Sequence, residues 1–177
     1  PTELIQDGGF EQPPTSSPWT QFSRGGYTVI LSSASAHTGN AAFFPCAYPD
    51  CDDRVAQTIT VPPTASIHQA KLRFWLETFS LFPGTLPNPP CVDHVYATLA
   101  TLDGTVLPGG GSILASCENS PVFGYQFETF DVTSLLQAHG GQQLVLTFRG
   151  TTSNEAPVAQ FYTCLLYTSD AADDLTR

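Results

Sequence analysis

The chain is poor in charged residues, and most of those it has are acidic. Only 12% of the 177 residues are Asp, Glu, Lys or Arg, against about 25% in an average soluble protein. Six Lys and Arg residues oppose sixteen Asp and Glu residues, and the net charge of -10 would repel nucleic acids and anionic membranes. No run approaches the roughly 18 apolar residues that a membrane-spanning helix needs. We therefore expect neither nucleic-acid binding nor membrane insertion.

Helix signals are also scarce. Apolar and polar residues instead alternate in short runs separated by Gly, Pro, Asn and Asp, which is the two-residue period of half-buried strands. About eight such runs predict an all-β fold, an antiparallel β-sandwich of the jelly-roll kind, with one short helical turn over 133–138. Strands are expected over residues 27–32, 41–44, 54–61, 71–79, 94–102, 127–132, 144–149 and, truncated, 158–162.

The end of the sequence differs from the rest. From Cys164 it reads CLLYTSDAAD, which resembles the translation of a sequencing adapter that contaminates proteins predicted from metagenomes. We therefore expect residues 1–163 to form one domain and residues 164–177 to be a non-native, disordered tail. A genuine acidic tail is the alternative.

Four cysteines precede this tail, an even number that suits disulfides in a secreted protein. The favoured pairing joins Cys46 with Cys51 across a tight loop, and Cys91 with Cys117 between two loops rich in Pro and Gly. A zinc site is the alternative, although only the spacing of Cys46 and Cys51 comes near a metal-binding knuckle.

The alternation also assigns a core face and an outer face to each strand. Apolar residues at even positions from Leu72 place the neighbouring polar and aromatic side chains on the outer face. The strands over 71–79, 94–102 and 144–149 all show this alternation. If they share a sheet, their outer faces together offer aromatic rings beside hydrogen-bonding charges, which suits a sugar. A partly solvated sheet whose Trp75 is shielded by loops and whose charges pair with one another is the alternative. The candidate ligand-binding residues are Arg73, Trp75, Glu77, His94, Tyr96 and Arg149.

Several short motifs recur in a familiar order. The segments 4–11, 36–42, 57–62 and 72–75, continued by 130–133 and 144–152, resemble bacterial extracellular jelly-roll modules of the carbohydrate-binding, galactose-binding-like superfamily. The resemblance covers essentially the whole of 1–163. Such modules are commonly attached to secreted glycoside hydrolases and peptidases, so it implies a secreted accessory module, and Pro1 would then follow a cut in a longer precursor. Its partners would be carbohydrate or neighbouring domains of the parent protein.

The resemblance also implies a structural calcium ion. Members of the superfamily often hold Ca2+ where the opening segment meets the loop before an early strand. In this sequence, Glu11 would supply a carboxylate, and Asp7, Gly39 and Asn40 would supply carbonyl or side-chain oxygens. Glu11 hydrogen-bonded to loop amides is the alternative. A second acidic group, Asp50, Asp52 and Asp53, is expected to be a solvated loop next to Arg54.

Motifs for catalysis are absent from the sequence. The four histidines are scattered, and there is no zinc-hydrolase motif, nucleophile elbow or phosphate-binding loop. The sequence therefore predicts a non-catalytic module that binds carbohydrate. The alternative is a spacer or adhesion module without a sugar site, and exposure of Trp75 distinguishes the two, because a buried ring favours the spacer.

Overall fold

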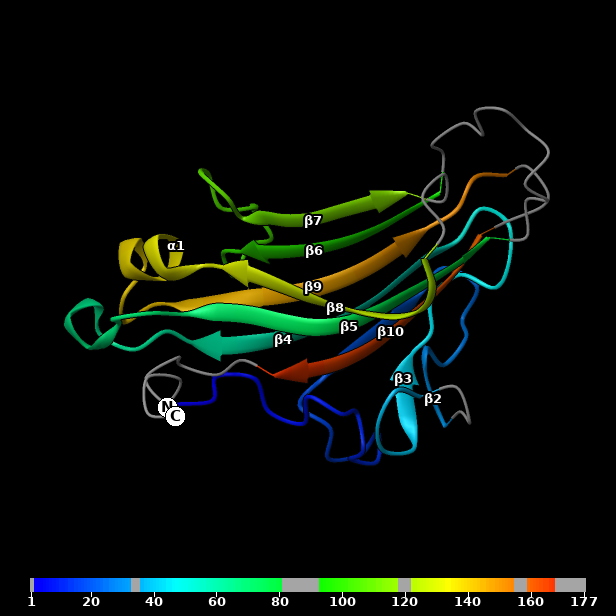
Figure 1. Cartoon of the computed structure of the whole chain (residues 1–177), viewed down its shortest axis with the longest axis horizontal. Helices are drawn as coiled ribbons and strands as arrows, with labels where there is room; N and C mark the ends of the chain where they lie inside the picture. Colours follow the sequence, from blue (N-terminus) through cyan, green and yellow to red (C-terminus); the bar gives the residue numbers. More distant parts are fainter. Residues whose placement is uncertain (1, 33–35, 81–92, 118–121, 155–158, 168–177) are drawn as a thin grey trace.

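The computed structural model describes residues 2–32, 36–80, 93–117, 122–154 and 159–167. These residues form two five-stranded sheets that pack face to face (Figure 1). Sheet A has the strand order β1-β4-β9-β6-β7 and sheet B has the order β2-β3-β10-β5-β8. The paired strands are antiparallel throughout both sheets. The predicted all-β antiparallel sandwich is therefore confirmed.

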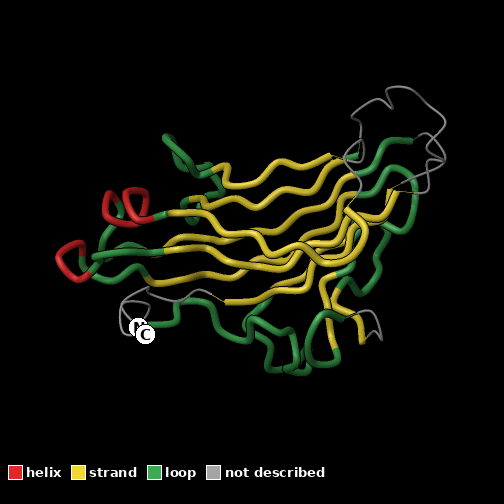
Figure 2. The backbone as a smooth tube through the Cα atoms, in the orientation of Figure 1, coloured by secondary structure: helices red, strands yellow, loops and turns green. Residues whose placement is uncertain are grey.

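The elements follow one another along the chain with little helix between them. Sheet A contains β1 (Thr20–Ser23), β4 (Asp52–Thr60), β6 (His94–Ala100), β7 (Ser112–Cys117) and β9 (Gln143–Thr151). Sheet B contains β2 (Ile30–Ser32), β3 (Ala41–Phe43), β5 (Lys71–Ser80), β8 (Val122–Asp131) and β10 (Ala159–Tyr167). The 3-10 turn η1 (Thr64–Ser66) and the helix α1 (Thr133–Ala138) lie at one end of the sandwich (Figure 2).

The predicted faces match the observed burial. Leu72, Phe74 and Leu76 of β5 are buried, and the alternate residues Arg73, Trp75 and Glu77 are only partly buried. The same alternation holds on β6 and β9, where Val95, Ala97, Leu99, Leu144, Leu146 and Phe148 point into the core. Each sheet therefore presents one apolar face to the other.

The core is centred on aromatic rings from both sheets. Phe74 of sheet B meets Phe148 of sheet A edge to face, with ring centroids 5.2 Å apart, and stacks on Phe130 at 5.7 Å. Trp19, from the segment before β1, lies 6.3 Å from Phe148 and donates a hydrogen bond from Nε1 to the Asp7 carbonyl. The opening segment is therefore anchored to the same core as the strands.

The structure has two strands that the pattern did not predict, β1 and β7. No residue of β1 is fully buried, so the strand lacks the apolar alternation that would reveal it. β7 directly follows the glycines at 109–111, and no strand was predicted between residues 102 and 127. The helix α1 has the predicted bounds, and the Asp131 carboxylate accepts a hydrogen bond from the Thr133 backbone N–H at its start.

The last strand is longer than predicted. β10 runs beyond Tyr162 to Tyr167, and its backbone lies between β3 and β5 with Cys164 opposite Trp75. The first four residues of the segment 164–177 are thus part of sheet B, although that segment was expected to be disordered. Residues 168–177 lie outside the described part, and the non-native origin of the segment stays a prediction.

The aromatic core sets a first prediction about stability. Phe148 is fully buried, so Phe148→Ala should lower the free energy of unfolding by about 3–5 kcal/mol through lost packing and a residual cavity. Phe127→Ala is the matched control, because Phe127 is 49% exposed, and it should cost about 1 kcal/mol or less. Urea unfolding followed by circular dichroism measures both values. Equal losses in the two variants would contradict this account of the core.

Candidate functional site

The six predicted ligand-binding residues do not form one site. Arg73, Trp75 and Glu77 lie on β5 in sheet B, whereas His94 and Tyr96 lie on β6 and Arg149 on β9, both in sheet A. All six point away from the core, and the outer faces of two packed sheets are opposite surfaces of the molecule. The expectation that they share a face is therefore wrong. Alternation shows that a side chain points outward, but it does not show to which sheet the strand belongs.

On the outer face of sheet B, Trp75 is covered by other side chains. The His37 ring, from the loop before β3, stacks on it with centroids 3.8 Å apart and planes at 17°. Phe127 of β8 is directly opposite Trp75 in the register, with ring centroids 5.0 Å apart, and Tyr125 meets His37 edge-on at 5.2 Å. Glu77 accepts a hydrogen bond from the Gly124 backbone N–H at 3.0 Å. This aromatic cluster ties the 36–40 loop to sheet B and leaves Trp75 only partly exposed.

The outer face of sheet A carries a row of side chains across four strands. In the strand register, Phe22 on β1 lies opposite Arg54 on β4, Arg54 opposite Arg149 on β9, and Arg149 opposite Tyr96 on β6. Directly opposite residues in antiparallel strands point to the same face. We call these four residues the arginine–aromatic row. With neighbouring strands about 4.8 Å apart, the row extends for about 14 Å across the sheet.

Contacts with Asp52 and with the Phe22 ring hold the two guanidinium groups of the row in place. Arg149 donates two hydrogen bonds to Asp52, from Nε at 2.8 Å and from Nη2 at 2.9 Å. Arg54 Nη2 lies 3.6 Å from the same carboxylate, and the Arg54 guanidinium carbon lies 4.4 Å from the centre of the Phe22 ring. Two arginines directly opposite each other repel, so Asp52 and the Phe22 ring offset an arrangement that is otherwise unfavourable.

The row is accessible to a ligand. The exposed fractions are 47% for Phe22 and, for the side chains of Arg54 and Arg149, 42% and 43%. Not every atom of the row is open, because Arg54 Nε is itself buried, with no hydrogen-bond partner among the described residues. His94 stacks beside Tyr96 with ring centroids 5.4 Å apart and planes at 14°. The face therefore combines rings with fixed donors and one fixed carboxylate.

A hollow lies at the β1 edge of the same sheet. It has a volume of about 190 Å³, and its lining includes Thr20, Ala56, Thr58 and Val145. Thr20 lies two residues before Phe22 on β1, and Ala56 lies two residues after Arg54 on β4. Thr20 and Ala56 are directly opposite each other in the register. The surface of sheet A is thus indented next to the row.

The charges of Asp52 and Arg149 stabilise each other. The hydrogen bonds from Arg149, reinforced by the charges of Arg149 and Arg54, lower the pKa of Asp52 below its usual value despite its burial. The Asp52 carboxylate in turn raises the pKa of Arg149. Both groups are therefore charged across the physiological range.

The acidic group at 50–53 is not the solvated loop that we predicted. Asp52 and Asp53 begin β4 and are 7% and 2% exposed. Asp53 accepts hydrogen bonds from the Cys46 backbone N–H at 3.0 Å and the Tyr48 hydroxyl at 2.7 Å, while exposed Asp50 pairs with Arg24 at 2.5 Å. Buried carboxylates require such partners, and chain neighbours alone did not reveal them. Asp52 and Arg54 were missed as candidates for the site for this reason, and Phe22 was missed because β1 was not predicted.

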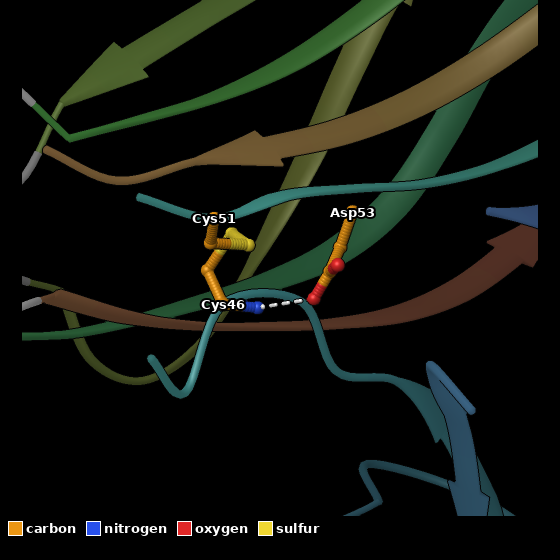
Figure 3. Close-up of side chains that lie close together, drawn as sticks. All are labelled: Cys46, Cys51 and Asp53. Atoms are coloured by element: carbon orange, nitrogen blue, oxygen red, sulfur yellow. Dashed lines mark hydrogen bonds between the residues drawn. A yellow bond between two sulfur atoms is a disulfide. The ribbon is translucent and has the colours of Figure 1, made fainter. Parts of the chain in front are cut away.

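Cys46 and Cys51 form a disulfide, as predicted (Figure 3). Together with Asp53 they are the only group of three metal-binding residue types that lie close together within the described part of the chain. Because the two sulfur atoms are bonded to each other, neither is a thiolate that could bind zinc. Cys91 and the side chain of Cys117 lie outside the described residues, so their pairing stays a prediction.

The four residues predicted to bind calcium come together. Glu11 Oε1 accepts hydrogen bonds from the backbone N–H groups of Asn40 and Ala41 at 2.7 and 3.0 Å. Asp7 accepts the backbone N–H groups of Glu11 and Gln12 at 2.8 and 3.2 Å. Gly39 has φ of +71°, a backbone conformation that favours glycine, and a Cβ there would press on the Glu11 carboxylate. The observed contacts are those of the amide-bonded alternative.

No protein-family model and no curated protein matches the chain. Among solved structures, TmCBM61 in complex with β-1,4-galactotriose aligns over 96% of this chain and 99% of its own, with a TM-score of 0.58 and 11% identity. The two proteins share a β-sandwich fold.

Two other solved structures share the fold, with similarly low sequence identity. The Stig cyclase Fisc from Fischerella sp. TAU, in complex with (3Z)-3-(1-methyl-2-pyrrolidinylidene)-3H-indole, has a TM-score of 0.51 and 17% identity over 96% of this chain and 98% of its own. The enzymatically active domain of bacteriophage CBA120 tailspike protein 4 has a TM-score of 0.51 and 14% identity over 94% of this chain and 21% of its own. Proteins of different function share this sandwich, so function must be argued from the site. No helix in the described residues is long and apolar enough to cross a membrane.

The Asp52–Arg149 pair predicts an acid-dependent loss of stability. The pKa of Asp52 is lowered in the folded state, so its stabilisation is complete above its unfolded-state pKa of about 3.9 and is lost as the pH falls through the folded value. Asp52→Asn should therefore lower the free energy of unfolding by about 1–3 kcal/mol at neutral pH. This gap between the variant and the unsubstituted chain should close on acidification. Urea unfolding from pH 7 to pH 2 measures this gap.

The control for this experiment is Asp50→Asn. Asp50 pairs with Arg24 on the surface, where both side chains are more than half exposed, so the cost should stay within about 0.5 kcal/mol. A gap for Asp52→Asn that does not depend on pH would contradict the charge-based explanation.

Proposed function

We propose that this chain is a non-catalytic carbohydrate-binding module and that it binds its ligand on the outer face of sheet A. The observation that carries the proposal is the arginine–aromatic row. Phe22 and Tyr96 stand at its two ends, and two guanidinium groups lie between them. The fold shared with TmCBM61 is consistent with the proposal but does not locate a site.

The row matches the chemistry of a sugar. The C–H face of a pyranose packs on an aromatic ring, while its hydroxyls need donors and acceptors whose positions are already fixed. Asp52 holds Arg149 by two hydrogen bonds, so little side-chain freedom remains to be lost on binding. His94, stacked beside Tyr96, adds a third ring next to the row, whereas Asp52 is nearly buried and serves to hold Arg149.

The length of the row favours a short glycan chain over a single sugar. A ligand that contacts both Phe22 and Tyr96 has to extend about 14 Å across four strands, more than one pyranose ring covers. Affinity should therefore rise from mono- to trisaccharide and change little with further units. β-1,4-galactotriose, the ligand in the TmCBM61 structure, is the first probe to test.

The sugar site leads to a matched pair of variants. Tyr96→Ala removes a ring from the row and should weaken galactan oligosaccharide binding about tenfold, equivalent to about 1.4 kcal/mol. Tyr125→Ala removes the same atoms from the aromatic cluster on sheet B and should leave binding unchanged. Isothermal titration calorimetry measures both, after a glycan array has identified ligands if galactotriose does not bind.

The opposite outcome would place the site elsewhere. A loss of binding in Tyr125→Ala with none in Tyr96→Ala would move the site to sheet B, around Arg73, Trp75 and Glu77. No saturable binding to any glycan would leave the second candidate, a spacer or adhesion module. The stacking of His37 on Trp75 supports that candidate, because it covers the ring that was expected to meet a sugar.

We further propose that the module belongs to a secreted bacterial protein, in which it is attached to another domain. The Cys46–Cys51 disulfide supports export, because disulfides form and persist in oxidising compartments. The low charge content and the resemblance to extracellular modules support the same proposal.

Calcium binding is also a proposal. A carboxylate has about four lone-pair sites, so Glu11 and Asp7 keep acceptor capacity beyond the amide hydrogen bonds that they make. With backbone oxygens of the 39–40 turn they offer the hard oxygen ligands that Ca2+ prefers. The amide hydrogen bonds, chiefly that of Asn40, lower the pKa of Glu11, which keeps it ionised for a cation.

The melting temperature of the unsubstituted chain should therefore be higher in the presence of calcium than in the presence of a chelator. At a concentration 100 times the dissociation constant the gain is about 2.7 kcal/mol. Glu11→Gln preserves the shape of the side chain but removes the charge, and it should abolish the calcium effect. Differential scanning calorimetry with calcium and with a chelator tests this prediction. Identical midpoints in the parent protein would show that Glu11 acts only through the loop amides.

A further inference from the structure

An apolar pocket opens at the end of the sandwich where η1 and α1 lie (Figure 2). We call it the end pocket. Its volume is about 110 Å³, and it reaches inward between the two sheets. Neither the arginine–aromatic row nor the aromatic cluster on sheet B contributes to it.

The interior of the end pocket is apolar on every side. Sheet A supplies Ile59, Leu99 and Leu146, sheet B supplies Leu72, α1 supplies Leu136, and the opening segment supplies Ile5. Each of these six residues is at most 5% exposed. A charged or strongly polar group inside would lose its hydration without gaining a hydrogen bond.

The rim has a different composition. Thr2, Ser66, Gln69 and Lys71 lie where the pocket meets solvent. Hydrogen bonds from Thr133 chiefly lower the pKa of Asp131, and the charge of Lys71, opposite Asp131 in the register of β5 and β8, adds to this effect. The cation at the rim therefore has an anion beside it, which favours an uncharged polar group on a ligand over a carboxylate.

The size of the end pocket suits a single ring. Native cores are packed so closely that few voids exceed a water molecule. An apolar cavity of about 150 Å³ stays dry and binds benzene, because water inside would find no hydrogen-bond partners. The end pocket is somewhat smaller but open on one side, so a ring can enter and leave a substituent outside.

We propose that the end pocket binds the apolar part of a small uncharged molecule, a single aromatic ring or an alkyl chain of similar volume, whose polar end remains at the rim. This site is separate from the proposed sugar site and does not depend on it. Both sheets, the helix and the opening segment would contact the ligand at once.

Benzyl alcohol is the probe, because it has one ring and one hydroxyl. Titrated into the full chain with labelled methyl groups, it should shift the ¹³C methyl signals of Ile5, Ile59 and Ile67 along saturable curves. Leu136→Phe fills the pocket and should weaken binding at least tenfold. Leu114→Phe, the same substitution at a partly buried position of β7 outside the pocket, should leave binding unchanged.

Further variants keep the test decisive. If Leu136→Phe does not fold, as judged by circular dichroism, Ile67→Phe fills the pocket from another buried lining position. Tyr96→Ala should bind benzyl alcohol like the parent protein, which separates this site from the sugar site. Shifts that grow linearly without saturation, or equal affinity in the parent protein and a folded pocket-filling variant, would overturn the proposal.

Discussion

Phe74 on β5 and Phe148 on β9 meet edge to face between the two sheets, and the rest of the structure depends on the apolar layer that they centre. Both rings are fully buried, and Phe130 and Trp19 extend the contact toward an edge strand and the opening segment. Once these inward positions are occupied, the two-residue period of each strand directs the neighbouring side chains to solvent. The outer faces, and any ligand site on them, are thus a consequence of the core.

This constraint gives the two outer faces different properties. On sheet B, the 36–40 loop lies over β5, and His37 covers Trp75. On sheet A, the strand register aligns Phe22, Arg54, Arg149 and Tyr96 across the sheet and leaves them partly exposed. An open row of rings and fixed charges can meet an extended polar ligand, whereas a covered ring mainly stabilises the loop above it. The end pocket is a third kind of surface, formed where the apolar layer itself reaches solvent.

Electrostatics reinforces the arrangement on sheet A. The chain has a net charge of -10, yet two of its six cationic residues lie next to each other in one row. Asp52, nearly buried at the start of β4, makes this proximity tolerable by accepting two hydrogen bonds from Arg149. Such a network positions donors before a ligand arrives, which lowers the entropic cost of binding.

The sequence by itself determined the all-β class, the inward and outward positions on β5, β6 and β9, the bounds of α1, and the Cys46–Cys51 disulfide. These features follow from local periodicity, capping and short-range geometry, which a single strand or loop contains. Membership of a sheet does not, because β5 and β6 are consecutive in the described chain yet belong to opposite sheets. For the same reason the partners of Asp52 and Asp53, the covering of Trp75 by His37 and the end pocket could not be predicted. The contacts of Asp53 with Cys46 and Tyr48 are short-range and depend on how the loop before β4 folds back. The others join residues far apart in the chain, and only the tertiary structure brings them together.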